Sequence, residues 1–315
     1  MKSASPEDTT LADIGNSVWN ETDASNTTAA PDGAPEGMAP SGVNNVLRAH
    51  QGGVKRFWNK INAVKTTGGT TSAYTLTYDV TPGAYVDGEI ISFVVNAANA
   101  ASATLNVNAL GATPLRLFGA ALMAGALQAN QIIQARYNTS AGAFDILRPA
   151  GWAVLSKVTA SAASYADFPS IPAGVNHIQI IGELKPSADG ANVVLTTYGA
   201  DGIIDAGGTD YSYILAVNLS DGTSAVNTSG AASILMASSV DNGTTGCMVR
   251  AEAANIQAAT NTKFSIQSTF LNSSGSLGVS VVGIGVRNEA DRITGVRVSP
   301  SSGSITGEFT LLACS

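Results

Sequence analysis

The spacing of the larger apolar residues changes once along the chain. Between Ser41 and Lys65 they recur at alternating intervals of four and three residues, which is the pattern of a helix with one narrow apolar seam. From Thr66 onward, short runs alternate apolar and polar residues and are separated by Gly, Ser, Asn and Asp, which predicts strands and turns. We therefore expect a mainly β protein with one long helix near its N-terminus.

The predicted helix, residues 41–65, would be roughly 35 Å long at about 1.5 Å per residue. Its seam consists of Val43, Leu47, His50, Val54, Phe57, Ile61 and Val64. Because no other segment offers this seam a helical partner, we expect identical copies to associate through it as a parallel coiled coil. The mixture of β-branched and aromatic residues in the seam favours a coiled coil of three helices. The alternative is a helix that packs on the protein's own sheet.

The polar and flexible residues of this helix have separate consequences. We interpret His50 as a polar layer that sets the register, and not as a metal ligand, because the seam has no second ligand. Gly52 and Gly53 each cost about 1 kcal/mol in a helix interior and leave the straightness of the helix open. Ser41 follows Pro40 and is the expected cap of the first turn. The basic residues lie off the seam: Arg48, Lys55, Arg56, Lys60 and Lys65.

Residues 1–40 form an acidic arm before this basic helix. Seven acidic residues are opposed by Lys2 alone, in a background of Ser, Thr, Asn, Ala and Pro that cannot build a core. We expect charge attraction to fold the arm along the helix or onto an adjoining subunit. The apolar residues that would anchor it are Leu11, Ile14, Val18 and Trp19.

Two β-domains are predicted after the helix. In residues 66–149, six runs predict strands of a small antiparallel sandwich or barrel; they cover 72–78, 89–96, 103–108, 113–118, 131–138 and 142–147. In residues 150–315, about ten runs indicate a β-sandwich of jelly-roll type; they cover 152–158, 175–184, 192–199, 211–219, 232–238, 247–256, 263–272, 278–287, 293–299 and 308–313.

Composition and charge narrow the classes of function. Only 12% of the residues are charged and the net charge is −7. Nucleic acid is not an expected partner, because phosphate binding needs a basic surface and the only basic segment is the helix. We expect no membrane span, since no apolar run approaches about twenty residues. We also expect no secretion signal, since the N-terminus lacks a basic region followed by an apolar one. Cys247 and Cys314 are too few for a disulfide framework and fit synthesis in a reducing cytosol.

The sequence offers little catalytic chemistry. His177, the only histidine outside the seam, precedes Ile178 and Ile180 in a predicted strand, which favours a structural role over a Ser/His/Asp site. No glycine motif of a phosphate-binding loop is present. We therefore expect no enzyme activity, no cofactor and no bound metal.

One Gly-rich stretch combines aromatic and acidic residues. Because aromatic rings stack on sugars and carboxylates accept hydrogen bonds from hydroxyl groups, we hypothesise a receptor contact made by Tyr198, Asp201, Asp205, Asp210 and Tyr211. Two alternatives stay open for these residues. The acids can be ordinary turn residues or cation ligands, and Tyr211 and Tyr213 can fill the core of the sandwich.

The N-terminal region resembles a known group of proteins. Trp19, Asn26-Thr27, the run EGMAPSGVN at 36–44 and Arg48, which lead into a helix that ends near Trp58, resemble the N-terminal module of tailed-bacteriophage tail fibres and related appendage proteins. That resemblance implies attachment to the virion and oligomerisation. The runs TGGTTSAYTLTYD and DGEIISFVVN resemble the β-domain that follows the stem there as a spacer.

The C-terminal region extends this resemblance. Residues 196–215 and 296–312 resemble a sandwich domain that lies at the distal end of phage tail proteins. The expected function is then that of a homotrimeric structural virion protein, made in the host cytoplasm, that binds other virion proteins through its arm and a host surface glycan or protein through its distal domain. The alternatives are a head-fibre, collar or tail-adaptor protein without receptor binding and, least supported, a polysaccharide depolymerase that uses paired carboxylates.

Overall fold

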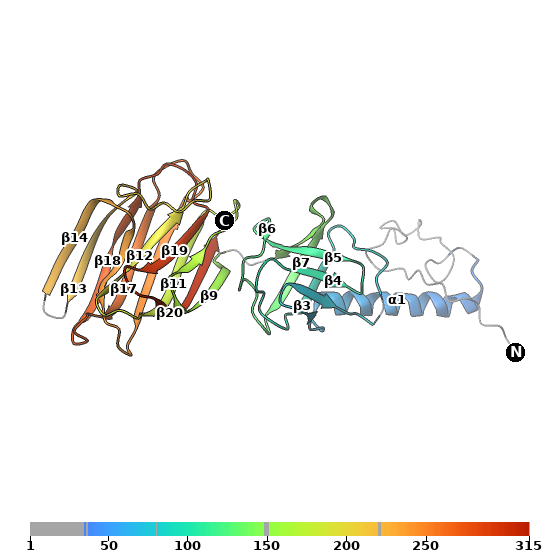
Figure 1. The fold of residues 1–315 in the computed structure, drawn as a ribbon. Helices are drawn as coiled ribbons and strands as arrows, with labels where there is room; N and C mark the ends of the chain where they lie inside the picture. The colour runs from blue at the N-terminus through green and yellow to red at the C-terminus, as the bar shows by residue number, and fades with distance from the viewer. Residues whose placement is uncertain (1–34, 36, 80, 148–150, 220–221, 315) are drawn as a thin grey trace. The chain divides into compact units, whose positions relative to one another are not determined.

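The structure of the chain is a computed structural model, and it describes residues 35, 37–79, 81–147, 151–219 and 222–314 (Figure 1). The chain forms two compact units. The first runs to Leu117 and resumes from Leu127 to Arg148, and the second comprises Phe118–Ala126 and Pro149–Ser315. The predicted mainly β character is confirmed, with the long helix in the first unit. The short segment 118–126 belongs to the second unit, which the sequence pattern does not indicate.

The long helix α1 spans Pro40–Ile61 without interruption at Gly52 and Gly53. Its start differs from the expectation that Ser41 is the cap. The cap residue is Ala39, which makes no side-chain cap hydrogen bond, and Pro40 occupies the first helical position, where a missing N–H costs nothing. The helix ends four residues earlier than predicted, since Asn62 caps the carbonyl of Trp58 and Ala63 takes a positive φ of 50°. Val64 therefore lies outside the helix, and its place in the helical seam was wrong.

The six strands expected in the first unit are all present. Three shorter elements, β1, β6 and η2, accompany them. The sheet has the strand order β1-β2-β4-β5-β8-β7-β3. The elements are β1 (Gly68–Gly69), β2 (Ala73–Leu76), β3 (Ile90–Val94), β4 (Thr104–Val107), β5 (Ala112–Leu117), β6 (Ala120–Ala121, in the segment that belongs to the second unit), β7 (Ile132–Asn138), the 3-10 turn η2 (Thr139–Ala141) and β8 (Ala143–Leu147).

The first unit is not purely antiparallel, which corrects the expectation. β2 pairs with β4 in parallel, and β5 pairs with β8 in parallel. Parallel neighbours need a long connection between them, and the chain supplies one in each case, through β3 and through β7. A bridge between Thr66 and Val94 joins the two ends of the sheet. The core beneath it is apolar and includes Tyr74, Phe93, Leu105, Leu115 and Phe144.

The second unit is a pair of antiparallel sheets. One has eight strands in the order β14-β13-β18-β17-β16-β11-β20-β9, and the other has four in the order β10-β19-β12-β15. The strands are β9 (Ala153–Ala163), β10 (Ala166–Phe168), β11 (His177–Pro186), β12 (Ala191–Tyr198), β13 (Tyr211–Leu219), β14 (Gly222–Ala231), β15 (Ile234–Val240), β16 (Cys247–Ala254), β17 (Lys263–Leu271), β18 (Gly278–Arg287), β19 (Gly295–Pro300) and β20 (Ile305–Cys314).

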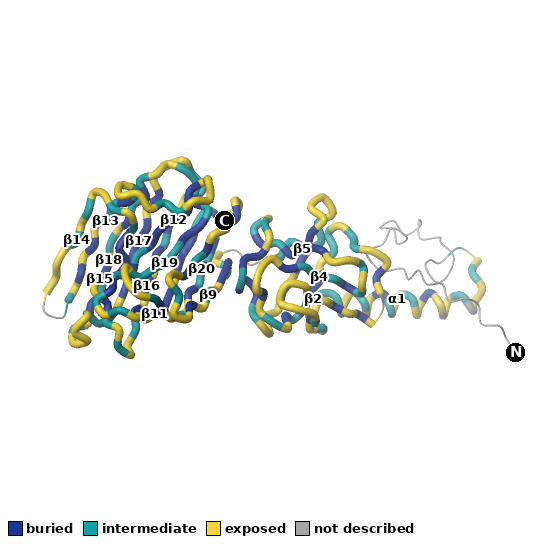
Figure 2. Tube along the Cα trace, viewed as in Figure 1, coloured by how far each residue is buried: buried dark blue, intermediate teal, exposed yellow. Residues whose placement is uncertain are grey.

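The two sheets face each other across an apolar core. β15 of the smaller sheet packs over β16, β17 and β18 of the larger one. Strands of the larger sheet alternate buried and exposed residues, as in β16, where Cys247 is buried and Met248 is exposed, so that one face lines the core and the other faces outward. All ten expected strands are present, whereas β10 and β14 were not expected. β14 is an edge strand, and most of its residues are exposed (Figure 2).

Candidate functional site

The helical seam is exposed to solvent along most of α1. The exposed fractions are 43% for Val43, 55% for Leu47, 59% for Val54 and 46% for Phe57, and His50 is exposed as well. Apolar side chains at one face of a helix usually supply much of its stability by packing. The seam from Val43 to Phe57 thus presents an exposed apolar stripe, at the positions that the sequence pattern indicated.

The last turn of α1 packs on the protein's own sheet. α1 contacts β3, and Ile61 is only half-buried there. The Lys60 Nζ atom lies 2.6 Å from the Glu89 Oε1 atom, and the two side chains are only 11% and 16% exposed. This nearly buried ion pair fixes the end of the helix to the residue that precedes β3. The packing that the sequence left as an alternative therefore holds for the last turn of the helix.

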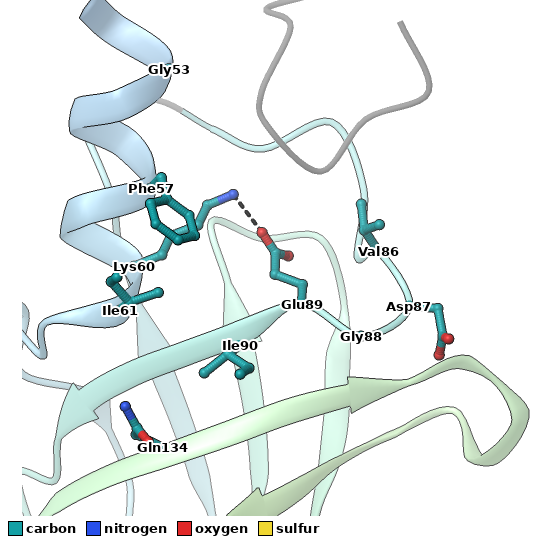
Figure 3. A pocket seen from close by; sticks show the side chains of 10 residues that line it. All are labelled: Gly53, Phe57, Lys60, Ile61, Val86, Asp87, Gly88, Glu89, Ile90 and Gln134. Atoms are coloured by element: carbon teal, nitrogen blue, oxygen red, sulfur yellow. Dashed lines mark hydrogen bonds and ion pairs between the residues drawn. The ribbon is translucent and has the colours of Figure 1, made fainter. Parts of the chain in front are cut away.

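A pocket of about 530 Å³ opens beside this turn (Figure 3). Phe57, Lys60 and Ile61 approach it from the helix, Ile90 from β3, and Gln134 from β7. Phe57 and Ile61 belong to the seam, and Ile90 is 37% exposed. The apolar stripe of the helix thus continues into a hollow with an apolar wall, a feature that sequence reasoning missed because its lining comes from three separate elements.

Loss of the Lys60–Glu89 ion pair should destabilise the first unit. We expect Lys60→Met to lower the free energy of unfolding by about 2–4 kcal/mol, because a carboxylate that stays nearly buried loses its counter-charge. Burial and Glu89 together also raise the pKa of the Tyr78 hydroxyl, so this hydroxyl stays neutral and adds no second negative charge beside Glu89. Urea denaturation at fixed protein concentration would measure the change.

Lys65→Met is the matched control for that substitution. Lys65 pairs with Asp79 at 2.8 Å, but the Asp79 side chain is 80% exposed, so the loss should stay below about 1 kcal/mol. Equal losses for the two variants would contradict a special role of the Lys60–Glu89 pair.

The hypothesised receptor contact lies around a buried arginine. Arg287, at the end of β18, is fully buried, and its Nε atom donates to the Asp205 Oδ2 atom at 2.7 Å. A second nitrogen of its guanidinium group, Nη1, forms an ion pair with Asp291. The Thr197 hydroxyl also donates to Asp205, at 2.7 Å. Asp205 is therefore a counter-ion inside the fold, a role that the sequence analysis did not consider for it.

The aromatic residues of this contact are largely buried. Tyr211 is fully buried, and its hydroxyl accepts from the Thr197 N–H at 2.8 Å, so Tyr211 fills the core as the alternative proposed. Burial raises the pKa of its hydroxyl to about 12. Tyr198 is 8% exposed and donates its hydroxyl proton to Asp167 at 2.7 Å. Neither ring presents a free face for stacking on a sugar.

The two remaining acids shape the exposed turn. Asp201 accepts from the Ile203 N–H at 2.9 Å, and Asp210 accepts from the Gly207 N–H at 2.5 Å. Ile203, at the tip between them, is 65% exposed. A receptor contact at this loop stays a prediction, and the structure brings Asp201 and Ile203, not the tyrosines, to the surface that a ligand would meet.

A second ionic cluster lies on the smaller sheet. Arg297 of β19 pairs with Asp167 of β10 at 2.9 Å, and its guanidinium carbon lies 3.8 Å from the ring centre of Tyr165. Tyr165 is 44% exposed. Sequence reasoning did not find this cluster, because Asp167 and Arg297 are separated by 130 residues. It holds the short strand β10 to the sheet.

The residues considered for chemistry lie apart. His177 begins β11 and is opposite Cys314 in the sheet register. Cys247 lies at the other end of the neighbouring strand and is buried. Among the residues that the structure describes, no three His, Cys, Asp or Glu side chains form a group that could hold a metal ion. Within the same residues, no helix is long and apolar enough to cross a membrane.

The predicted anchor residues Leu11, Ile14, Val18 and Trp19 lie outside the described residues. The docking of the acidic arm on the helix is therefore a prediction that concerns the part of the chain before residue 35. Comparisons with protein-family models, curated proteins and solved structures find no significant match to this chain. The geometry of the exposed seam and its pocket is thus the basis for a functional assignment.

Proposed function

We propose that the chain is a structural bacteriophage virion protein, and that three copies form an appendage such as a tail fibre. The observation that carries this proposal is the exposed seam of α1, because a helix that spaces apolar residues by four and three and leaves them in solvent is built for other helices. In the proposed trimer, α1 forms a parallel coiled coil. The protein acts by assembly and attachment and catalyses no reaction.

Burial of the seam would supply the energy of assembly. Full burial of a Val, Leu or Phe side chain contributes about 1.5–3 kcal/mol, and about half of that area is still exposed at Val43, Leu47, Val54 and Phe57. Four such residues in each of three copies would contribute roughly 12 kcal/mol before entropic costs. His50 would form one polar layer in this seam. The pocket beside Phe57 would take side chains of the adjacent copy.

The other parts of the proposal follow the sequence resemblance. The arm before α1 would attach the trimer to other virion proteins through Leu11, Ile14, Val18 and Trp19. The second unit, as a jelly-roll-like sandwich, would lie distal to the virion and bind a glycan or protein of the host surface. Three tethered copies raise the avidity of a weak contact by orders of magnitude.

Adsorption competition tests this proposal. The purified full chain, after its trimer mass is verified, is added to host cells before the phage whose genome encodes it. We expect reduced phage adsorption, and we expect the inhibition to disappear when residues 151–315 are removed. A trimer that leaves adsorption unchanged would favour a head-fibre, collar or tail-adaptor role. Shortening of the surface polysaccharide by the protein would instead indicate a depolymerase, and a monomeric mass would overturn the trimer.

A further inference from the structure

The outer face of the eight-stranded sheet carries a second exposed apolar patch. Ile214 on β13 is opposite Ile284 on β18, and Ala216 is opposite Val282. The exposed fractions are 58% for Ile214, 50% for Ile284 and 48% for Val282, and Ala216 is also exposed. Directly opposed residues of neighbouring strands lie about 5 Å apart. These four residues therefore form one continuous surface, which we name the β13/β18 patch.

The surroundings of the β13/β18 patch carry almost no charge. On one side, the register places Asn227 and Ala225 of β14 beside Ile214 and Ala216. On the other side, β17 contributes uncharged neighbours of Ile284 and Val282, namely Ser265 and Gln267. The charged residues nearest to the patch among the described residues of this face are Lys263, opposite Val286, and the Arg250–Glu252 ion pair, one strand beyond Gln267 and Ser265. A neutral, mostly aliphatic surface of this kind is typical of the buried centre of a protein interface.

The edge strand next to the patch has no protection of its own. β14, with the sequence GTSAVNTSGA, contains no charged residue and no proline over its ten residues. Natural proteins usually protect a long edge strand with charges, proline or a covering segment. Most residues of β14 are exposed (Figure 2), and its main contacts are with β13. The patch and this edge thus form one continuous uncovered surface.

We propose that the β13/β18 patch and the β14 edge pack against the second unit of another copy of this chain. This inference rests on the proposed function, since α1 would hold the copies together at an effective concentration in the millimolar range. Each copy carries a net charge of −7, so copies repel each other unless they meet at neutral surfaces. The patch has no aromatic ring, so it does not suit the stacking of a sugar.

Thiol labelling of the full chain tests this contact. Ala216→Cys is made in a Cys314→Ser background, in which burial raises the pKa of the remaining Cys247 to about 12 and keeps that thiol unreactive. A maleimide-linked polyethylene glycol is then added to the assembled protein and to the same protein with Leu47→Glu in the helical seam. We expect labelling of the introduced thiol at position 216 to be about tenfold slower in the assembly. This factor corresponds to a contact between copies that is open for about a tenth of the time.

Met248→Cys is the matched control. Met248 is 55% exposed and faces outward from the same sheet, but it lies on β16, beyond the patch. Its labelling rate should be the same in both backgrounds. Equal rates at position 216 in a protein of trimer mass would overturn the contact between copies and leave the patch for a different virion protein. A monomeric mass of the parent protein would overturn the seam, and with it this inference, before any labelling.

Discussion

Leu47→Glu should convert the proposed trimer into folded monomers. Leu47 is 55% exposed in the single chain, so a glutamate there costs the monomer little. In a trimeric coiled coil the same position is central, and three carboxylates would meet in one layer. Each loses its hydration at a cost of several kcal/mol, and the apolar burial of three leucines is lost as well. The total loss is roughly 10 kcal/mol or more, a factor above about a million in the association constant.

Light scattering coupled to gel filtration would measure this change as a drop in mass to that of one chain. Asn45→Glu is the matched control, because Asn45 is also exposed and adds the same charge to the same helix, but lies about 200° around the axis from Leu47. It should keep the oligomeric mass. Dissociation of both variants would point to general charge repulsion, and dissociation of neither would remove the seam from the assembly.

The strands with an alternating pattern could be predicted closely from the sequence. β13 was expected at 211–219 and spans Tyr211–Leu219, because its apolar residues alternate between a buried and a solvent face. β14 was missed for the opposite reason. Most of its residues are exposed, so its sequence does not alternate between apolar and polar residues. The parallel pairing of β2 with β4 was also beyond the pattern, since periodicity reports which face a residue occupies and not which strand lies beside it.

For the candidate sites too, the sequence predicts features made by residues close together in the chain, but not those made by residues far apart in it. The spacing of α1 predicts which residues form a stripe, and those within the helix lie on it. The pocket beside Phe57 joins three elements, which no local spacing reveals. Asp205 was interpreted from its Gly-rich surroundings as a ligand-binding or turn acid, but it neutralises Arg287, 82 residues away. A charged residue next to a turn does not disclose whether its counter-charge is a ligand or the protein itself.

Arg287→Met should strongly destabilise the second unit. Arg287 is fully buried, and its guanidinium is the counter-charge of Asp205, whose side chain is 14% exposed, and of Asp291. It also donates to the carbonyl groups of Glu289 and Asp291, at 3.1 and 3.0 Å. Removal leaves a buried carboxylate and two carbonyls without their donor. We expect the free energy of unfolding at neutral pH to fall by about 3–5 kcal/mol, as for other broken buried pairs.

Arg250→Met is the control for this loss. Arg250 pairs with Glu252 at 2.8 Å on the solvent face of the same sheet, and both side chains are at least 40% exposed. Its removal should cost less than about 1 kcal/mol. Urea denaturation followed by circular dichroism, at one protein concentration, would give both values. Similar losses for the two variants would show that the charge of Arg287 stabilises the fold no more than that of an exposed arginine.

The pH dependence separates the charge of Arg287 from its packing. Partial burial raises the pKa of Asp291, but the Ala200 N–H and Arg287 outweigh this effect and hold the pKa below its usual value. A carboxyl whose pKa is lower in the folded state stabilises the fold above its unfolded pKa, and this stability is lost as the pH falls through the folded pKa. The wild-type protein should therefore lose stability below about pH 4, where Asp291 takes up a proton and its pairing with Arg287 ends. The Arg287→Met variant has no such pairing, so it should lose less stability over the same pH range. The difference between the two proteins should shrink on acidification, and a difference that stays the same at low and neutral pH would assign it to packing.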